Sequence, residues 1–178
     1  MTTNKKLYWA LFAATMIVYG AMLLWSLPYV RTQAAGLIPF DLRPSGYSFE
    51  DAQTFVTALT PEGAAFYLGT QHLLDLFYPA MIGLVVLFAL WHLSATWPTW
   101  LRLVLAAVPI LSAVFDYLEN NAVTKMVTAG PDGLTADLVA SASQWTLLKS
   151  GFSTVGMTAV VALLVANFVR KRIGGGQE

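Results

Sequence analysis

The segment AVFDYLENN, residues 113–121, places two carboxylic acids and an amide on one face of an apolar helix. Asp116 precedes Glu119 by three residues and Asn120 by four, and residues at these spacings share a helix face. Carboxyl and amide groups in this arrangement are suited to bind a hydrogen-bonding ligand, to hold a divalent cation or to transfer protons. The setting is unusual, because the thirteen residues before Asp116 carry no charge.

Other polar residues fall at a similar height in neighbouring apolar segments. Counted from the ends of one short connection, Asp75 lies 92 − 75 = 17 residues from His92, and Asp116 lies 116 − 102 = 14 residues from Arg102. At about 1.5 Å per residue these heights are about 25 and about 21 Å. Helices joined by a short connection are usually neighbours. We therefore predict one ligand-binding layer that contains His72, Asp75, Asp116, Glu119, Asn120 and Lys149.

Four long apolar segments must position this layer. Of the 178 residues, 57% are hydrophobic and only 11% are charged, far fewer than the roughly 25% of a soluble domain. A helix needs about 20 apolar residues to cross a bilayer. The sequence predicts an all-α integral membrane protein, a single four-helix domain over residues 1–173 with a flexible tail at 174–178. The expected transmembrane helices cover residues 7–30, 64–91, 101–127 and 144–169.

The first connection is long enough to contain structure of its own. Ser48 has the character of an N-cap, and the apolar residues that follow recur at helical spacing. We therefore expect a short amphipathic helix on the outer surface. Asp41 and Arg43 are expected to form a local pair in this loop, although Asp41 is also a candidate to fold over the polar layer. Thr60 and Pro61 have the character of an N-cap and a first helical residue, so they open the second long helix.

The helices themselves carry three further signals. Pro79 and Pro109 are each expected to kink a helix beside the polar layer. A helix from Thr135 to Val169 would be about 52 Å long, so we expect it to break or to project above the membrane before Trp145. Small residues recur at every fourth position of the last helix, which predicts a packing seam for a membrane-protein partner or a second copy. This ridge comprises Ser150, Thr154, Thr158, Ala162 and Ala166.

The basic residues predict the orientation of the chain. Lys5 and Lys6 precede the first helix, Arg102 lies near the second connection, and residues 170–172 are all basic. The first connection contains more acids than bases. Because basic residues favour the cytoplasmic side, we expect both termini in the cytoplasm and the long loop outside, in the plasma (inner) membrane.

Several classes of function are disfavoured. The ten basic and ten acidic residues cancel, so no net positive field recruits nucleic acid. The chain has no cysteine, which excludes thiolate chemistry. His72 and His92, the two histidines, are 20 residues apart on one helix, about 30 Å, and cannot ligate one haem. No phosphate-binding loop, nucleophile elbow or HExxH motif is present, and the sequence names no cofactor.

Asp75 with Pro79, and the stretch PILSAVFDYLEN at 109–120, are similar to features of the four-helix sterol-binding and isomerising proteins of the EXPERA group. The resemblance implies four membrane helices and a pocket for an amphipathic ligand. The first helix, residues 7–30, contains no acid to match theirs. The likeness therefore covers the layout and a dozen residues, and does not make the chain a member.

Four interpretations of the polar layer remain open. The first is a hydrogen-bond network that fixes helix packing, as in an accessory or assembly subunit. The second is a pocket for an amphipathic or lipid-like small molecule, since ionisable residues within a membrane usually mark sites. The third is a site that holds a metal or a general acid for an enzyme acting on lipid, and the fourth is proton transfer along Asp75, Asp116 and Glu119. We predict the pocket.

Overall fold

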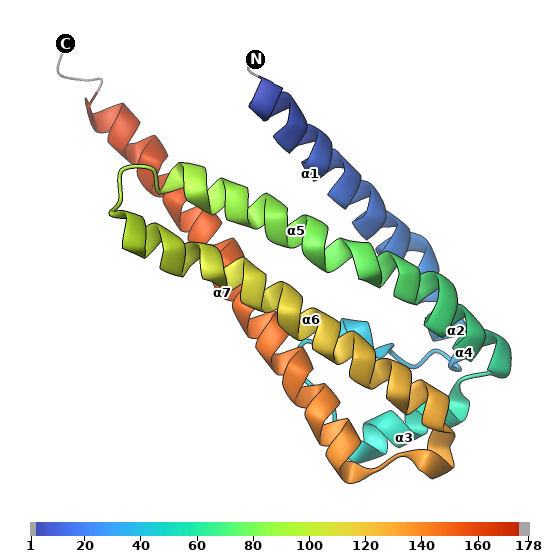
Figure 1. Ribbon diagram of the computed structural model, residues 1–178. Helices are drawn as coiled ribbons and strands as arrows, with labels where there is room; N and C mark the ends of the chain where they lie inside the picture. Colours follow the sequence, from blue (N-terminus) through green and yellow to red (C-terminus); the bar gives the residue numbers. More distant parts are fainter. Residues whose placement is uncertain (1–2, 175–178) are drawn as a thin grey trace.

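The computed structural model describes residues 3–174, which form four long helical segments and contain no strand (Figure 1). Each segment is long and apolar enough to cross a membrane. The first combines α1 (Thr3–Ala21), a π-helical turn η1 (Met22–Ser26) and α2 (Leu27–Gln33), and the second combines α4 (Pro61–Phe66), a second π-helical turn η3 (Tyr67–Gln71) and α5 (His72–Leu93). The third is α6 (Thr99–Gly133), and the fourth is α7 (Ala136–Gly174).

The four segments run side by side, with both chain ends at one end of the bundle (Figure 1). We call this the terminal end. The opposite end carries the long connection between α2 and α4, which includes a 3-10 turn η2 (Phe40–Leu42) and the short helix α3 (Phe49–Ala58). We call this the loop end. α6 packs most extensively against α7 and α5, while α1 packs mainly on α5.

The prediction of four long apolar helices is confirmed, although each helix extends beyond the predicted limits. Of the two alternatives expected for the last helix, the break before Trp145 does not occur, because α7 runs without interruption over 39 residues. No proline lies between Thr135 and the end of α7, so every amide in this stretch can donate within the helix. At 1.5 Å per residue, α7 is about 58 Å long, longer than a bilayer is thick.

Departures from α-helical geometry do not fall at Pro79 or Pro109, whereas a third proline, Pro131 in α6, directly follows a bend at Gly130. α5 continues through Pro79, and α6 continues through Pro109. The helical pattern changes instead in the π-helical turns η1 and η3, and at Gly130, where a φ of 68° bends the end of α6. Turns of this π type are frequent at functional sites.

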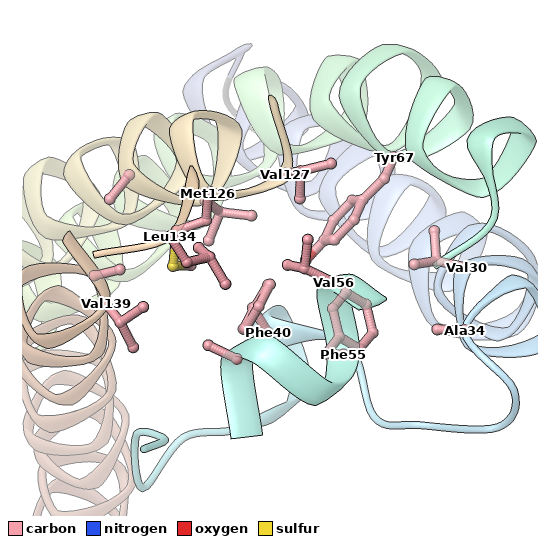
Figure 2. Close-up of a cluster of buried hydrophobic side chains, with 14 residues drawn as sticks. Val30, Ala34, Phe40, Phe55, Val56, Tyr67, Met126, Val127, Leu134 and Val139 are labelled. Carbon is pink, nitrogen blue, oxygen red and sulfur yellow. The ribbon is translucent and has the colours of Figure 1, made fainter. Parts of the chain in front are cut away.

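The loop folds against the bundle and completes a hydrophobic core at the loop end (Figure 2). Phe40, Phe55 and Met126 are fully buried there. α3 begins at the predicted N-cap, where Ser48 and Asp51 form a reciprocal capping box. Its apolar face packs inward on the bundle and does not lie free on the surface as the sequence suggested, because the core offers that face more complete burial. Fully burying one such side chain stabilises the fold by roughly 1.5–3 kcal/mol.

A second, smaller core near the terminal end contains Val86, Leu90 and Leu163. Gly156 of α7 lies against this core, where an added Cβ would make an ordinary van der Waals contact of 3.5 Å with the Val86 side chain. The small-residue ridge is not a seam inside the bundle: Ser150 is half-buried and Thr154, Thr158, Ala162 and Ala166 face outward. The predicted tail at 174–178 begins at the last residue of α7, and residues 175–178 lie outside the described part of the chain.

Candidate functional site

Asp116 and Glu119 project from α6 toward Lys149 on α7. The Lys149 Nζ atom lies 3.2 Å from Asp116 Oδ1 and forms a second ion pair with the Glu119 carboxylate. The Thr146 hydroxyl, one turn before Lys149, also donates to Glu119. Glu119 is 1% exposed and Thr146 equally so. Lys149 is therefore the countercharge for both α6 acids, and these residues form a closed group that we call the lysine group.

A second polar group lies where the two π-helical turns meet. The hydroxyl of Ser26, at the end of η1, donates to Gln71 Oε1 at the end of η3 over 2.5 Å. The Gln71 amide donates in turn to Asp75 Oδ2 over 3.1 Å. All three side chains are buried. The π-helical turns thus bring a hydroxyl, an amide and a carboxyl into a continuous chain.

The loop supplies the next member of this chain, Asp41 from η2. Its carboxylate accepts a hydrogen bond from the buried Tyr67 hydroxyl and lies within hydrogen-bonding range of the Asp75 carboxyl. Two carboxyl groups in such contact attract only when they share a proton, since two carboxylates would repel. The expected local pair of Asp41 and Arg43 does not form, because Arg43 turns away to Asp51, 3.9 Å distant. We call Ser26, Tyr67, Gln71, Asp75 and Asp41 the aspartate group.

A small cavity adjoins the aspartate group. It has a volume of about 10 Å³, close to the least space that accommodates one water molecule. Its polar lining includes Asp41, Asp75, His72 and Asn120. The Asn120 amide approaches the backbone oxygen of Asp75 at 3.5 Å. The cavity is therefore a meeting point for the loop, η3, α5 and α6, and it contains no lysine or arginine among its lining residues.

The single layer predicted from helix heights is thus two adjacent groups. The structure brings Asp116, Glu119 and Lys149 together on one side of α6, and His72, Asp75 and Asn120 on the other. The reason is that Glu119 and Asn120 are consecutive residues, whose side chains point about 100° apart around a helix with 3.6 residues per turn. Height along a helix was predictable, whereas the rotation of each face required the packed structure.

No three His, Asp or Glu side chains within residues 3–174 converge in a way that could hold a metal ion. Lys149 already occupies the space between Asp116 and Glu119. The arrangement of these side chains therefore favours hydrogen bonding and ion pairing over metal coordination.

The sequence interpretation did not include Ser26, Tyr67 and Thr146 in the site. A single hydroxyl in an apolar helix is usually satisfied by its own backbone, as Thr15 is through the Leu11 carbonyl. Ser26 and Thr146 differ because each also reaches a side chain on another helix. Ser26 lies at the same height as Gln71, and Thr146 lies at the same height as Glu119. This match in height was the signal in the sequence that could have identified them as members of the site.

Tyr47 brings the loop to the lysine group. Its hydroxyl is buried beside Thr146 and Glu119. Burial and the nearby Glu119 charge raise the pKa of Tyr47 above its usual range, so the hydroxyl keeps its proton. The loop therefore touches both polar groups, through Asp41 and through Tyr47.

The fold defines the class of protein: an all-helical chain whose four long apolar helices are compatible with a polytopic membrane protein. Searches with this chain found no matching family model, no matching curated protein and no matching solved structure.

Proposed function

We propose that this protein is a four-helix integral membrane protein that binds an amphipathic or lipid-like small molecule at the polar groups of its loop end. The ligand-contacting residues in this proposal are His72, Asp75, Asp116, Glu119, Asn120 and Lys149, joined by Asp41 from the loop. The bilayer supplies the ligand. The hydrogen-bonding chemistry of the site suits a molecule with a hydroxyl or amine group.

The observation that carries the proposal is the uneven distribution of charge between the two groups. Lys149 pairs with both Asp116 and Glu119, whereas Asp41 and Asp75 share a cavity with no lysine or arginine in its lining. A carboxyl pair in an apolar setting is costly unless hydrogen-bond donors satisfy it. Tyr67 and Gln71 each donate one hydrogen bond to this pair, and a ligand that donates to the remaining carboxyl oxygens would add to them.

The loop must move to admit such a ligand, since the cavity holds at most one water. The loop has turns with positive φ on both sides of Asp41: Ala35, Gly36 and Gly46 have φ values of 52°, 84° and 78°. In this proposal the loop is a lid, and its withdrawal exposes Asp75, His72 and Asn120.

The distribution of basic residues supports an orientation with the terminal end in the cytoplasm and the loop end outside, in the inner membrane. Lys5, Lys6, Arg102 and residues 170–172 belong to the terminal end. Basic residues near helix ends favour the cytoplasmic side. The ligand would then reach the lid from the outer leaflet.

A second candidate is an accessory or assembly subunit whose polar groups only fix helix packing. The observation that favours it is the completeness of the contacts, because Lys149, Thr146, Ser26 and Gln71 each bond to a side chain on another segment. In this alternative a partner protein or second copy would pack on the outward ridge of α7.

Native mass spectrometry of the detergent-purified protein separates the two candidates. We expect a bound small molecule in the wild type that is lost in Asp75→Asn and retained in Asp132→Asn, a change at an exposed acid in the α6–α7 turn. Unchanged occupancy in Asp75→Asn, together with a large loss of thermal stability, would support the packing role.

A further inference from the structure

A larger groove lies beside the lysine group, between the loop and the start of α7. It has a volume of about 380 Å³, within the range of about 300–1,000 Å³ typical of ligand pockets. One wall is Tyr47 to Phe49, and the other is a single face of α7. The α7 wall comprises Ala136, Val139, Ala140, Ser143, Gln144 and Leu147.

The two walls are held together by specific contacts. The backbone N–H of Tyr47 donates to Ser143 Oγ over 2.9 Å. Gly46 allows this approach, since a Cβ there would lie 2.6 Å from the same oxygen. Beyond Tyr47, the capping box of Ser48 and Asp51 fixes the start of α3. The groove is therefore a formed feature of the fold.

We propose that this groove holds the apolar body of the ligand, and that the ligand is an uncharged molecule with a single long apolar chain. The inference rests on the proposed function. Tyr47 lines the groove, and its hydroxyl lies buried beside Thr146 and Glu119. Tyr47 thus stands between the groove and the lysine group, and in this proposal rotation of its side chain joins them.

The lining favours an uncharged occupant. It contains hydroxyl and amide groups from Ser48, Ser143 and Gln144 and no charged side chain. Glu50 and Asp51 directly follow the lining in sequence, and Asp137 follows Ala136 on α7, while Arg43 pairs with Asp51 at 3.9 Å. The hydrogen bonds from Ser48 hold the pKa of Asp51 below its usual range, which keeps this carboxylate ionised. The acids next to the lining outnumber the one base that pairs with them, which disfavours an anionic occupant and does not disfavour one with a hydroxyl group.

The size and hydrogen bonding of the groove disfavour a docked peptide. Two turns of helix, about 10 Å wide and about 11 Å long, fill about 850 Å³, more than twice the groove volume. An extended peptide needs free backbone groups to pair with. Here the Tyr47 and Ser48 amides already donate to Ser143 and Asp51.

The groove is placed where a bilayer molecule can enter it. Leu147, the lining residue nearest the terminal end, is 50% exposed. It lies 170 − 147 = 23 residues from Arg170, about 35 Å along the helix. The hydrocarbon core of a bilayer is about 30 Å thick, so a span anchored at Arg170 puts Leu147 at the opposite membrane surface.

Photolabelling with a diazirine-bearing monoacylglycerol, an uncharged single-chain probe, tests the inference on the full-length protein in nanodiscs. We expect labelled peptides to contain Tyr47–Phe49 and residues 136–147. Ala140→Trp, at an exposed lining position, should reduce this labelling several-fold. Ser141→Trp, next to it but outside the lining, should leave it unchanged. A diazirine-bearing fatty acid, which is anionic, should label the groove several-fold less.

Labelling spread evenly over the lipid-facing helices, or equal labelling of the wild type and Ala140→Trp, would overturn the inference. Glu119→Gln distinguishes it from the proposed function. Groove labelling that is blocked by Ala140→Trp and unaffected by Glu119→Gln would support the groove and contradict a role for the lysine group. A copurified molecule that is lost in Glu119→Gln but retained in Ala140→Trp would overturn the inference about the groove and leave the proposed function standing.

Discussion

Asp41 and Asp75 lie with their carboxyl groups within hydrogen-bonding range, although 75 − 41 = 34 residues separate them in the chain. One comes from a 3-10 turn of the loop and the other from a long apolar helix. This contact fastens the loop to the bundle at the point where the cavity lies. It makes the loop part of the candidate site. In the lid proposal, this contact holds the loop closed over the cavity.

Asp41→Ala is expected to destabilise the protein by about 1–3 kcal/mol, because the Tyr67 hydroxyl loses its acceptor within a buried region. Asp41→Asn is the matched control, since its amide oxygen still accepts from Tyr67 and its NH₂ group can donate to Asp75. Thermal unfolding in one detergent compares the two variants. Equal loss of stability in both variants would contradict the conclusion that hydrogen bonds of Asp41 hold the loop to the bundle.

Lys149→Met is expected to cost about 3–5 kcal/mol, because it leaves Asp116 and Glu119 buried without their cation. The triple variant with Asp116→Asn and Glu119→Gln should recover much of this loss, since it removes the uncompensated charges. Denaturant unfolding measures all three proteins. A Lys149→Met variant as stable as the wild type would show that the ion pairs do not form.

Phe55→Ala should loosen the loop without removing a hydrogen bond from either polar group, although the Phe55 ring packs edge-on against that of Tyr67. Phe55 is fully buried in the core of the loop end, and truncation of such a side chain costs about 3–5 kcal/mol. We expect faster proteolysis within residues 34–60 and unchanged cleavage elsewhere. Phe49→Ala is a suitable comparison, because Phe49 is 38% exposed on the same helix. Similar cleavage of both variants would contradict the packing shown in Figure 2.

The start of α3 should respond to pH through Asp51. Hydrogen bonds from Ser48 hold the pKa of Asp51 below its unfolded value. The stabilisation is therefore complete above the unfolded pKa, about 4, and is lost as the pH falls through the lower folded pKa. The hydrogen-exchange protection factors of the α3 amides should fall below about pH 4 in the wild type. In Asp51→Asn this acid-dependent fall should be absent.

The helices were predictable because their apolar runs and the cap at Ser48 are local signals. The Thr60–Pro61 start of the second segment was predictable for the same reason. The π-helical turns were not, since no local residue pattern marks η1 or η3, and they are visible only where Ser26 meets Gln71. Whether α7 breaks or continues was left open because its length exceeds the membrane thickness, although no proline was present to end the helix.

The candidate site was predictable in part. Heights along the helices correctly brought Lys149 to the level of Asp116 and Glu119. Whether Asp41 paired with Arg43 or reached over the polar residues was undecidable from spacing alone, because the path of a long loop depends on the burial of Phe40 and Phe55. Glu119 and Asn120 belong to different groups because consecutive residues of a helix point in different directions. The height of a residue along the helix carries no information about that direction.

Quantifying small molecules that copurify with the protein tests the central claim most directly. The wild type and Asp75→Asn would be purified in parallel in a mild detergent, extracted with organic solvent and analysed by mass spectrometry. The account predicts one amphipathic species in near-stoichiometric amount in the wild type and a strong reduction in a folded Asp75→Asn variant. A wild type that carries only a non-stoichiometric mixture of bulk membrane lipids, unchanged in the variant, would contradict it.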